Sequence, residues 1–397
     1  MKISEIWRPD DHDFIVNPFP HYEKLRNLSP VFVSPTKDYV ILSYHEVKQV
    51  LSDRSCLAGV RKDWMIRAID FARKKGHDYQ VINKVMNALL FQMNPTVHTD
   101  LRRMMAEYWP SKDWVMQKAE KYSAQVIDEL PDQGNFVDHI ARKLPLLVIN
   151  DLLGSNFDLQ DIMKDGVEFL RTLDPYLTAR DLASINDAAT RLFYVFDKFY
   201  KQVDREGGSF SSWVKRNDAM IKGYNVDPIS MILFMYLAGQ DTTSNLISSI
   251  LQELLSHRQH LENLESTKKI ENFVHEILRL HCPVQLTERV NQNEMLLSGV
   301  TIPAGSILSL CIGAANRDPK TFENPSQIDL DRSKHNHITF GYGIHHCLGN
   351  QIALIEAEIL IKHLLPIIGQ YELVNEADWD NRLAIRNINS LMVKKVG

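Results

Sequence analysis

The longest helical pattern in the chain begins at Asp227, which is followed by Pro228. Aspartate is a preferred N-cap residue, and proline is favoured at the first position of a helix. Residues 229–238 are apolar on nearly every side, and apolar residues from 246 to 255 recur with the period of a helix. About thirty residues at about 1.5 Å per residue give a length of about 45 Å. We therefore expect a long helix that runs through the protein interior.

Two shorter helices and several strands are also predicted. Apolar positions over 270–278 recur every three to four residues, and this helix should end before Pro283. Another amphipathic helix should follow Cys347. Short strand-like runs occupy residues 31–33, 39–42, 284–286, 307–311 and 390–394. The pattern predicts a mainly α fold with a minor β region.

Composition narrows the class of protein. The chain has 397 residues, a net charge of -5 and basic residues spread along its length, which argues against a nucleic-acid partner. It contains no repeat and no linker rich in Pro, Gly or Ser, so we expect residues 1–397 to form a single domain. The first twenty residues lack the apolar segment of a signal peptide or membrane anchor, which predicts a cytoplasmic protein without an anchor.

The four cysteines are scattered and form no CxxC pair, so neither a disulfide framework nor a structural zinc site is indicated. Three of them are expected to be small buried hydrophobic residues. Cys347 differs because it follows two glycines and lies where an amphipathic helix starts. Amide groups and the positive end of the helix dipole stabilise a thiolate there, which is how a thiolate-bound heme iron is tuned.

Two other interpretations of this segment have weaker support. Gly341 and Gly343 begin like a dinucleotide-binding fingerprint, but the third glycine is missing. The nearby histidines could also form a zinc or copper cluster with Cys347, although the two pairs of histidines are too far apart for the usual ligand spacing. Those histidines are His335, His337, His345 and His346.

Two polar features of the helices have ambiguous meaning by themselves. Residues 238–243 place glycine, an acid and two hydroxyls within the apolar long helix. Such an interruption costs stability unless the groups are hydrogen-bonded or used, and a hydroxyl that bonds to the preceding turn is an equally good explanation. Glu276 and Arg279 lie three residues apart, a spacing for which a weak surface ion pair is the default.

Taken together, these segments resemble the cytochrome P450 family, in particular its soluble bacterial members, over nearly the whole chain. Three signatures of that family are complete and a fourth stretch, Asn-Arg-Asp-Pro, is also present. They are FxxGxHxCxG at Phe340, Gly341, Gly343, His345, Cys347 and Gly349, AGxDT at Ala238–Thr242, ExxR at Glu276–Arg279, and the stretch at 316–319.

The resemblance implies a cofactor and a fold. The fold would be the P450 triangular prism, and the cofactor would be heme b with Cys347 as the axial ligand of the iron. Arg332 would join Glu276 and Arg279 in a buried triad that holds the loop before the cysteine. Residues implied to contact the heme, four of them through its propionates, are His98, Arg102, Arg289, His345, Ala238, Phe340, Gly341 and Gly349.

The resemblance also implies an activity. The chain would insert one atom of O2 into an apolar small molecule, with electrons from a separate ferredoxin or flavodoxin-type donor. Asp241 and Thr242 would deliver protons, a role that would explain the polar interruption. A peroxide-driven peroxygenase or a heme-binding sensor remains the alternative. The implied substrate pocket consists of Leu89, Leu90, Phe234, Leu237, Val284 and Leu286.

Two departures from the family pattern limit these predictions. Many bacterial relatives carry arginines on the helix after the cysteine, where this chain has Leu354 and Ile355, so the docking surface for the usual donor is in doubt. Residues 61–93, which should cover the pocket, are basic in their middle and match no obvious template. The sequence therefore does not predict the substrate.

Overall fold

The computed structural model describes residues 2–76, 78–175 and 177–396. Helices dominate, as the sequence predicts, and the strands form small sheets. The chain divides into two compact units, which are described separately below. The first comprises Met1–Cys56, Lys112–Pro145 and Thr242–Gly397, and the second comprises Leu57–Ser111 and Leu146–Asp241.

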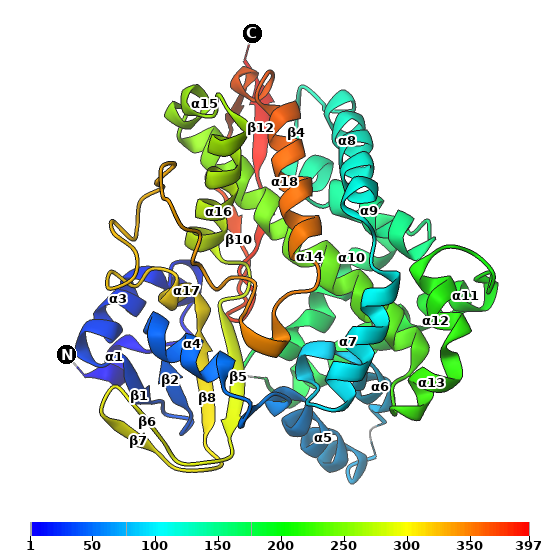
Figure 1. The fold of residues 1–397 in the computed structure, drawn as a ribbon, viewed down its shortest axis with the longest axis vertical. Helices are drawn as coiled ribbons and strands as arrows, with labels where there is room; N and C mark the ends of the chain where they lie inside the picture. The colour runs from blue at the N-terminus through cyan, green and yellow to red at the C-terminus, as the bar shows by residue number, and fades with distance from the viewer. Residues whose placement is uncertain (1, 77, 176, 397) are drawn as a thin grey trace. The chain divides into compact units, whose positions relative to one another are not determined.

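Three of the longer helices of the first unit pack together. They are α8 (Lys112–Asp128), α16 (Thr267–His281) and α18 (Asn350–Leu364). Helix α18 packs along α8 and also contacts α16 (Figure 1). Its apolar residues Ile359, Leu360 and Leu364 are buried. The amphipathic pattern after Cys347 therefore forms a packed helix whose start lies close to the cysteine in sequence.

A five-stranded sheet forms the other part of this unit. Its order is β1 (Val31–Val33), β2 (Tyr39–Ile41), β8 (Ile307–Cys311), β5 (Leu286–Asn291) and β3 (Cys56–Leu57). Strands β2 and β8 are parallel, whereas the pairs β1–β2 and β5–β8 are antiparallel. Ile41, Leu308 and Leu310, which lie on three positions of this sheet, belong to one buried hydrophobic cluster. The sheet positions Arg289 on β5.

Smaller strand pairs complete the first unit. Strand β12 (Met392–Lys395) lies between β4 (Gln133–Asn135) and β9 (Tyr371–Leu373), and β10 (Asp378–Trp379) pairs with β11 (Ile388–Ser390). The hairpin of β6 (Met295–Leu297) and β7 (Val300–Ile302) turns at two residues with positive φ, which suits a tight hairpin turn. The remaining elements of this unit are α1 (Ile3–Ile6), α2 (His12–Val16), α3 (Phe19–Leu28), α4 (Tyr44–Ser52), η2 (Val137–Ala141), α15 (Gln259–Asn263), α17 (Ile312–Ala315), η4 (Gly343–His345) and η5 (Ile368–Gln370).

The second unit is almost entirely helical. Helix α11 (Ala179–Gln202) packs against α10 (Leu159–Leu170) and α6 (Gln80–Ala88), and α6 also contacts α5 (Val60–Arg73). Aromatic rings of Phe157, Phe196 and Tyr236 pack at centroid distances of 4.6 to 5.9 Å. The other elements of this unit are η1 (Leu90–Gln92), α7 (Val97–Tyr108), η3 (Arg171–Leu173), α12 (Phe210–Arg216) and α13 (Asp218–Gly223).

Two helices cross the boundaries of the units, α9 (Lys143–Leu153) and α14 (Pro228–Ser256). Helix α14 has 29 residues and is the long helix that the sequence predicts. Asp227 caps it, because its carboxylate accepts a hydrogen bond of 2.8 Å from the backbone N–H of Ser230.

The expected strands agree with the structure except at three places. The strand expected at 39–42 ends one residue earlier, at Ile41. The strand expected at 284–286 begins only at Leu286, and Val284 forms a single bridge with Ile385. The strand expected at 390–394 is interrupted at Leu391, which separates β11 from β12. Over the described residues, no helix is both long and apolar enough to cross a membrane.

Candidate active site

Glu276 is the centre of a buried ionic cluster in the first unit. Its carboxylate accepts hydrogen bonds from Arg279 Nε at 2.8 Å and Nη2 at 2.7 Å, and from Arg332 Nε at 2.9 Å. The backbone N–H of Asp329 donates a further bond of 3.0 Å. The Glu276 and Arg279 side chains are only 2% and 1% exposed. The structure therefore brings the three predicted triad residues together, and the pair is not the surface ion pair that its spacing alone indicates.

These contacts keep the Glu276 carboxylate charged. Burial acts most strongly on the pKa of Glu276 and raises it, but the hydrogen bonds and charge of Arg279, together with Asp329 and Arg332, lower it overall. A buried carboxylate that accepts several bonds from guanidinium groups and an amide has the geometry that a buried ion pair needs.

The two arginines of the triad also hold a long loop. Arg279 donates to the backbone carbonyls of Asn316, Pro325 and Gln327 at 3.2, 2.6 and 2.8 Å. Arg332 Nη2 donates to the carbonyl of Glu323 at 3.1 Å. Because α16 carries Arg279, these bonds attach the loop to a packed helix.

The same loop is fixed again just before the cysteine segment. The Asn316 side chain accepts from the N–H of Ile338 at 2.8 Å and donates to the Thr339 hydroxyl at 2.8 Å. Thr339 in turn donates to the carbonyl of Leu278 on α16 at 2.7 Å. The residues that lead into Phe340 are therefore held by α16 as well.

The segment that carries Cys347 is folded back on itself. The backbone N–H of Cys347 donates to the carbonyl of Phe340 at 2.8 Å. Gly343 has a φ of 69°, and a Cβ at this position would lie 2.5 Å from the backbone oxygen of Leu51, so only glycine fits. Cys347 is exposed and lies three residues before the first residue of α18. A thiol in this place is near the positive end of the α18 dipole.

The other cysteines are unsuited to act as thiolates. All three are buried. Burial raises the pKa of Cys56 to about 11 and that of Cys282 to about 12, and it also raises the pKa of Cys311 well above its usual value. A buried thiol with a high pKa remains protonated and cannot act as a metal ligand in that form. Cys347 is therefore the cysteine whose surroundings suit ligation.

The centre of α14 combines a buried acid with an exposed apolar residue. The side chain of Asp241 is buried, with the residue 5% exposed, whereas Thr242 is partly exposed. Ala238 is exposed although residues 231–237 before it are buried. Gly239 allows close packing, since a Cβ there would lie 3.1 Å from Ile149 Cδ1.

Comparison with known proteins identifies the fold to which these features belong. The family profile described as Cytochrome P450 matches residues 225–366. The 6-deoxyerythronolide B hydroxylase of Saccharopolyspora erythraea is 26% identical over 405 residues, with 98% of each chain covered. The biotin biosynthesis cytochrome P450 of Bacillus subtilis is 27% identical, with 93% of each chain covered. The chain is therefore similar to cytochromes P450 over nearly its whole length.

Solved P450 structures agree with this assignment. P450BioI in complex with hexadec-9Z-enoic acid ligated acyl carrier protein superposes with a TM-score of 0.83 at 25% identity, covering 97% of this chain and 100% of that one. CYP109E1 from Bacillus megaterium in complex with testosterone has a TM-score of 0.82 at 23% identity, covering 98% of this chain and all of the other, and shows the fold alone. The chain thus has the P450 fold.

The cationic residues predicted to contact heme propionates are partly or fully buried. Arg289 is 5% exposed, and burial lowers its pKa to about 10. Its Nη1 donates to the carbonyl of Glu288 at 2.7 Å, and the structure gives it no ion pair with a carboxylate of any described residue. In the second unit, His98 and Arg102 lie one turn apart on α7, with His98 buried and Arg102 partly exposed.

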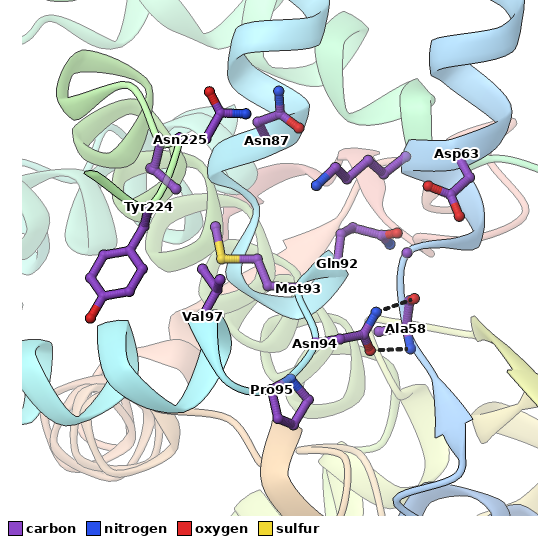
Figure 2. A pocket seen from close by; sticks show the side chains of 13 residues that line it. Ala58, Asp63, Asn87, Gln92, Met93, Asn94, Pro95, Val97, Tyr224 and Asn225 are labelled. Atoms are coloured by element: carbon purple, nitrogen blue, oxygen red, sulfur yellow. Dashed lines mark hydrogen bonds between the residues drawn. The ribbon is translucent and has the colours of Figure 1, made fainter. Parts of the chain in front are cut away.

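The predicted substrate-pocket residues do not line the cavity that the structure shows in the second unit. Leu89, Leu90, Phe234 and Leu237 are all buried, and Val284 and Leu286 of the first unit are partly buried. The cavity has a volume of about 330 Å³ and is lined mainly by polar groups (Figure 2). Its wall is held by a pair of hydrogen bonds between the Asn94 side chain and the backbone of Ala58, at 2.8 and 2.9 Å.

One buried acid escaped the sequence analysis. Glu356 lies on α18 among apolar residues and is 2% exposed, and burial raises its pKa to about 8. Its Oε2 atom has no hydrogen-bond partner among the described residues. The sequence held one signal of this burial. Leu354 and Ile355, which stand where many bacterial relatives carry arginines, place an apolar surface directly before Glu356.

Proposed function

We propose that the chain is a heme-thiolate monooxygenase that inserts one atom of O2 into an apolar small molecule. The observation that carries the proposal is Cys347, an exposed thiol held by a glycine-bent loop just before α18, whereas the other three cysteines are buried. When bound, heme b would supply oxygen activation, and the Cys347 thiolate would hold its iron and donate electron density to it.

The residues present fit such a cofactor. Arg289 is a buried cation without a carboxylate partner among the described residues, and a heme propionate would provide the missing anion. The exposed Ala238 within a buried part of α14 provides an apolar surface for a flat apolar ring. We propose that the other heme contacts come from His98, Arg102, Phe340, Gly341, His345 and Gly349. We also propose that residues 1–397 function as one P450 domain.

Asp241 and Thr242 have the chemistry for delivering protons. We infer that the Asp241 carboxylate takes up a proton and passes it on, while the Thr242 hydroxyl holds the acceptor by a hydrogen bond. The burial of Asp241 supports this role, because a buried acid within an apolar helix is costly unless it has a use.

The electrons would come from a separate ferredoxin or flavodoxin-type protein, and the substrate would contact Leu89, Leu90, Phe234, Leu237, Val284 and Leu286. A screen for compounds that convert the ferric heme from low to high spin tests the substrate class. It should include free fatty acids and the same acyl chains on an acyl carrier protein, because P450BioI was solved with such a carrier.

The central test replaces Cys347. The reduced carbonyl complex of the protein should show the red-shifted Soret band of thiolate ligation, and Cys347→Ala or Cys347→His should abolish it. Cys56→Ala is the matched control and should keep the band, since burial already holds that thiol protonated. A band that survives the Cys347 substitutions, or protein that binds no heme, would refute the proposal.

Added hydrogen peroxide separates the alternatives. A monooxygenase needs an electron donor, whereas a peroxygenase would form product from peroxide alone and a sensor would form none.

A further inference from the structure

One carboxylate and two imidazoles meet where α14 ends, away from the residues proposed to bind heme. Glu253 lies in the last turn of α14, His257 follows the helix, and His260 lies in α15. The backbone N–H of His257 donates to the carbonyl of Glu253 at 2.9 Å, and that of His260 donates to the carbonyl of His257 at 3.0 Å. Successive turns of backbone therefore present the three side chains together, all within the first unit.

The distances are close to those of a metal site. Glu253 Oε1 lies 2.9 Å from His257 Nδ1 and 3.2 Å from His260 Nε2. The candidate ligand atoms of the three residues lie within 4.8 Å of one another. Zinc binds imidazole nitrogen and carboxylate oxygen at about 2.0 to 2.2 Å, which places the ligand atoms of a tetrahedral ion about 3.3 Å apart. Small side-chain movements therefore suffice for the three to share one ion.

We propose that Glu253, His257 and His260 bind a divalent transition-metal ion, with zinc as the representative case. Imidazole and carboxylate together are a ligand set that suits Zn²⁺. The side chains of Glu253 and His260 are 13% and 15% exposed, so their positions are constrained, whereas that of His257 is 51% exposed. The ion can therefore enter from solvent, and water completes its coordination.

Neighbouring residues hold the ligands in place. His281, the last residue of α16, puts Nε2 at 3.7 Å from Glu253 Oε2, whereas His257 and His260 approach Oε1. The ring of buried Phe273 lies 5.7 Å from the ring of His260. Partners that orient a ligand in this way strengthen metal binding. An ion here would link the end of α14 to α15, and Glu253 in turn contacts His281 at the end of α16.

The charge of the cluster also favours a cation. The Glu253 carboxylate provides the acidic group of the cluster and lies beside both imidazoles. The guanidinium of Arg258, which lies between the two ligand histidines in sequence, is bonded to the carbonyl of Ile368 at 3.0 Å and to that of Tyr371.

A second group of histidines provides an internal control. Ligand atoms of Glu271, His275 and His335 also lie within 4.8 Å of one another. However, the rings of His275 and His335 stack at a centroid distance of 4.0 Å and an angle of 8°, and His275 Nδ1 is hydrogen-bonded to His337 at 3.0 Å. Since a metal binds an imidazole in the plane of its ring, two parallel stacked rings cannot both point at one ion.

The test uses tag-free, heme-loaded protein from which metals have been removed with a chelator. Equilibrium dialysis against micromolar free Zn²⁺, followed by elemental analysis of zinc, should give one zinc per chain. His257→Ala should weaken binding at least about tenfold, His281→Ala about 10- to 100-fold, and His257→Ala/His260→Ala should abolish it. His275→Ala/His335→Ala should leave one zinc bound.

Two further measurements keep the test independent of folding. In chelator, His257→Ala should melt like the wild type because its side chain is half exposed, whereas the rise of the melting temperature with added zinc should be lost. X-ray absorption at the zinc edge should show two imidazoles and one carboxylate. Absence of bound zinc in the wild type, or zinc retained by His257→Ala/His260→Ala, would overturn the proposal.

Discussion

The buried triad gives the sharpest prediction for stability. Replacing Glu276 by alanine removes the acceptor of both Arg279 and Arg332 and leaves the Arg279 guanidinium, 1% exposed, without its counter-ion. Breaking a buried ion pair costs about 3 to 5 kcal/mol because the remaining charge is uncompensated. Total stabilities are about 5 to 15 kcal/mol, so this loss is a large fraction of the whole.

The expected shift can be measured as a melting temperature. With an unfolding entropy of about 2.1 cal/mol/K per residue and 397 residues, a loss of 3 to 5 kcal/mol lowers the midpoint by about 4 to 6 °C. Arg279 and Arg332 also hold the loop that precedes Cys347, so the variant should contain much less heme than the wild type. Melting is followed by circular dichroism, and heme content by absorbance per chain.

Lys268→Ala is the matched control on the same helix. Lys268 and Glu271 are also three residues apart on α16, but their side chains are 65% and 39% exposed. A surface pair contributes about 0 to 1 kcal/mol, so melting and heme content should hardly change. If Glu276→Ala melts like Lys268→Ala and binds heme normally, the reasoning about the buried triad is wrong.

Three other predictions concern pH, turnover and the cysteine loop. Burial raises the pKa of Glu356 from 4.5 to about 8, so between pH 4.5 and pH 8 the folded state holds a proton that the unfolded state has lost. The free energy of unfolding should therefore fall as pH rises, by at most about 1.4 kcal/mol per pH unit. Glu356→Gln should remove this slope in melts from pH 5 to pH 8. Asp241→Asn should slow oxygen consumption, and Thr242→Ala should divert electrons into peroxide, while both variants keep a normal heme content. If both variants consume oxygen at the wild-type rate and form as much product per oxygen consumed, the proposed proton delivery is wrong. Gly343→Ala should lower heme content because its Cβ would meet backbone at 2.5 Å with φ at 69°, whereas Gly369→Ala, with nothing within 4 Å, should not; equal loading would argue against a rigid loop.

Local patterns in the sequence determined the main helices and the family motifs. The Asp227 cap and the following proline predicted the start of α14, because capping depends only on neighbouring residues. The strand at 307–311 was equally clear, since a short β-rich run needs no distant partner to be recognised. The segment around Cys347 could be recognised for the same reason: its glycines, its cysteine and the following helix are contiguous.

Only the tertiary structure decided which charges are buried. The spacing of Glu276 and Arg279 is the same for a surface pair and for a buried one. Their burial depends on the loop whose carbonyls Arg279 and Arg332 bind between 323 and 327. The high pKa of Glu356 likewise follows from the packing of α18 against α8 and α16, which a single helix does not reveal.

The histidine clusters show the same limit. Spacing along the chain argued against a metal cluster among the histidines near Cys347, and it did not point to Glu253, His257 and His260 at all. Their side chains meet because the backbone continues through successive turns after α14 and because α16 ends beside them at His281. Ligand geometry is a matter of a few ångströms between side chains on different elements, and the sequence alone does not specify such distances.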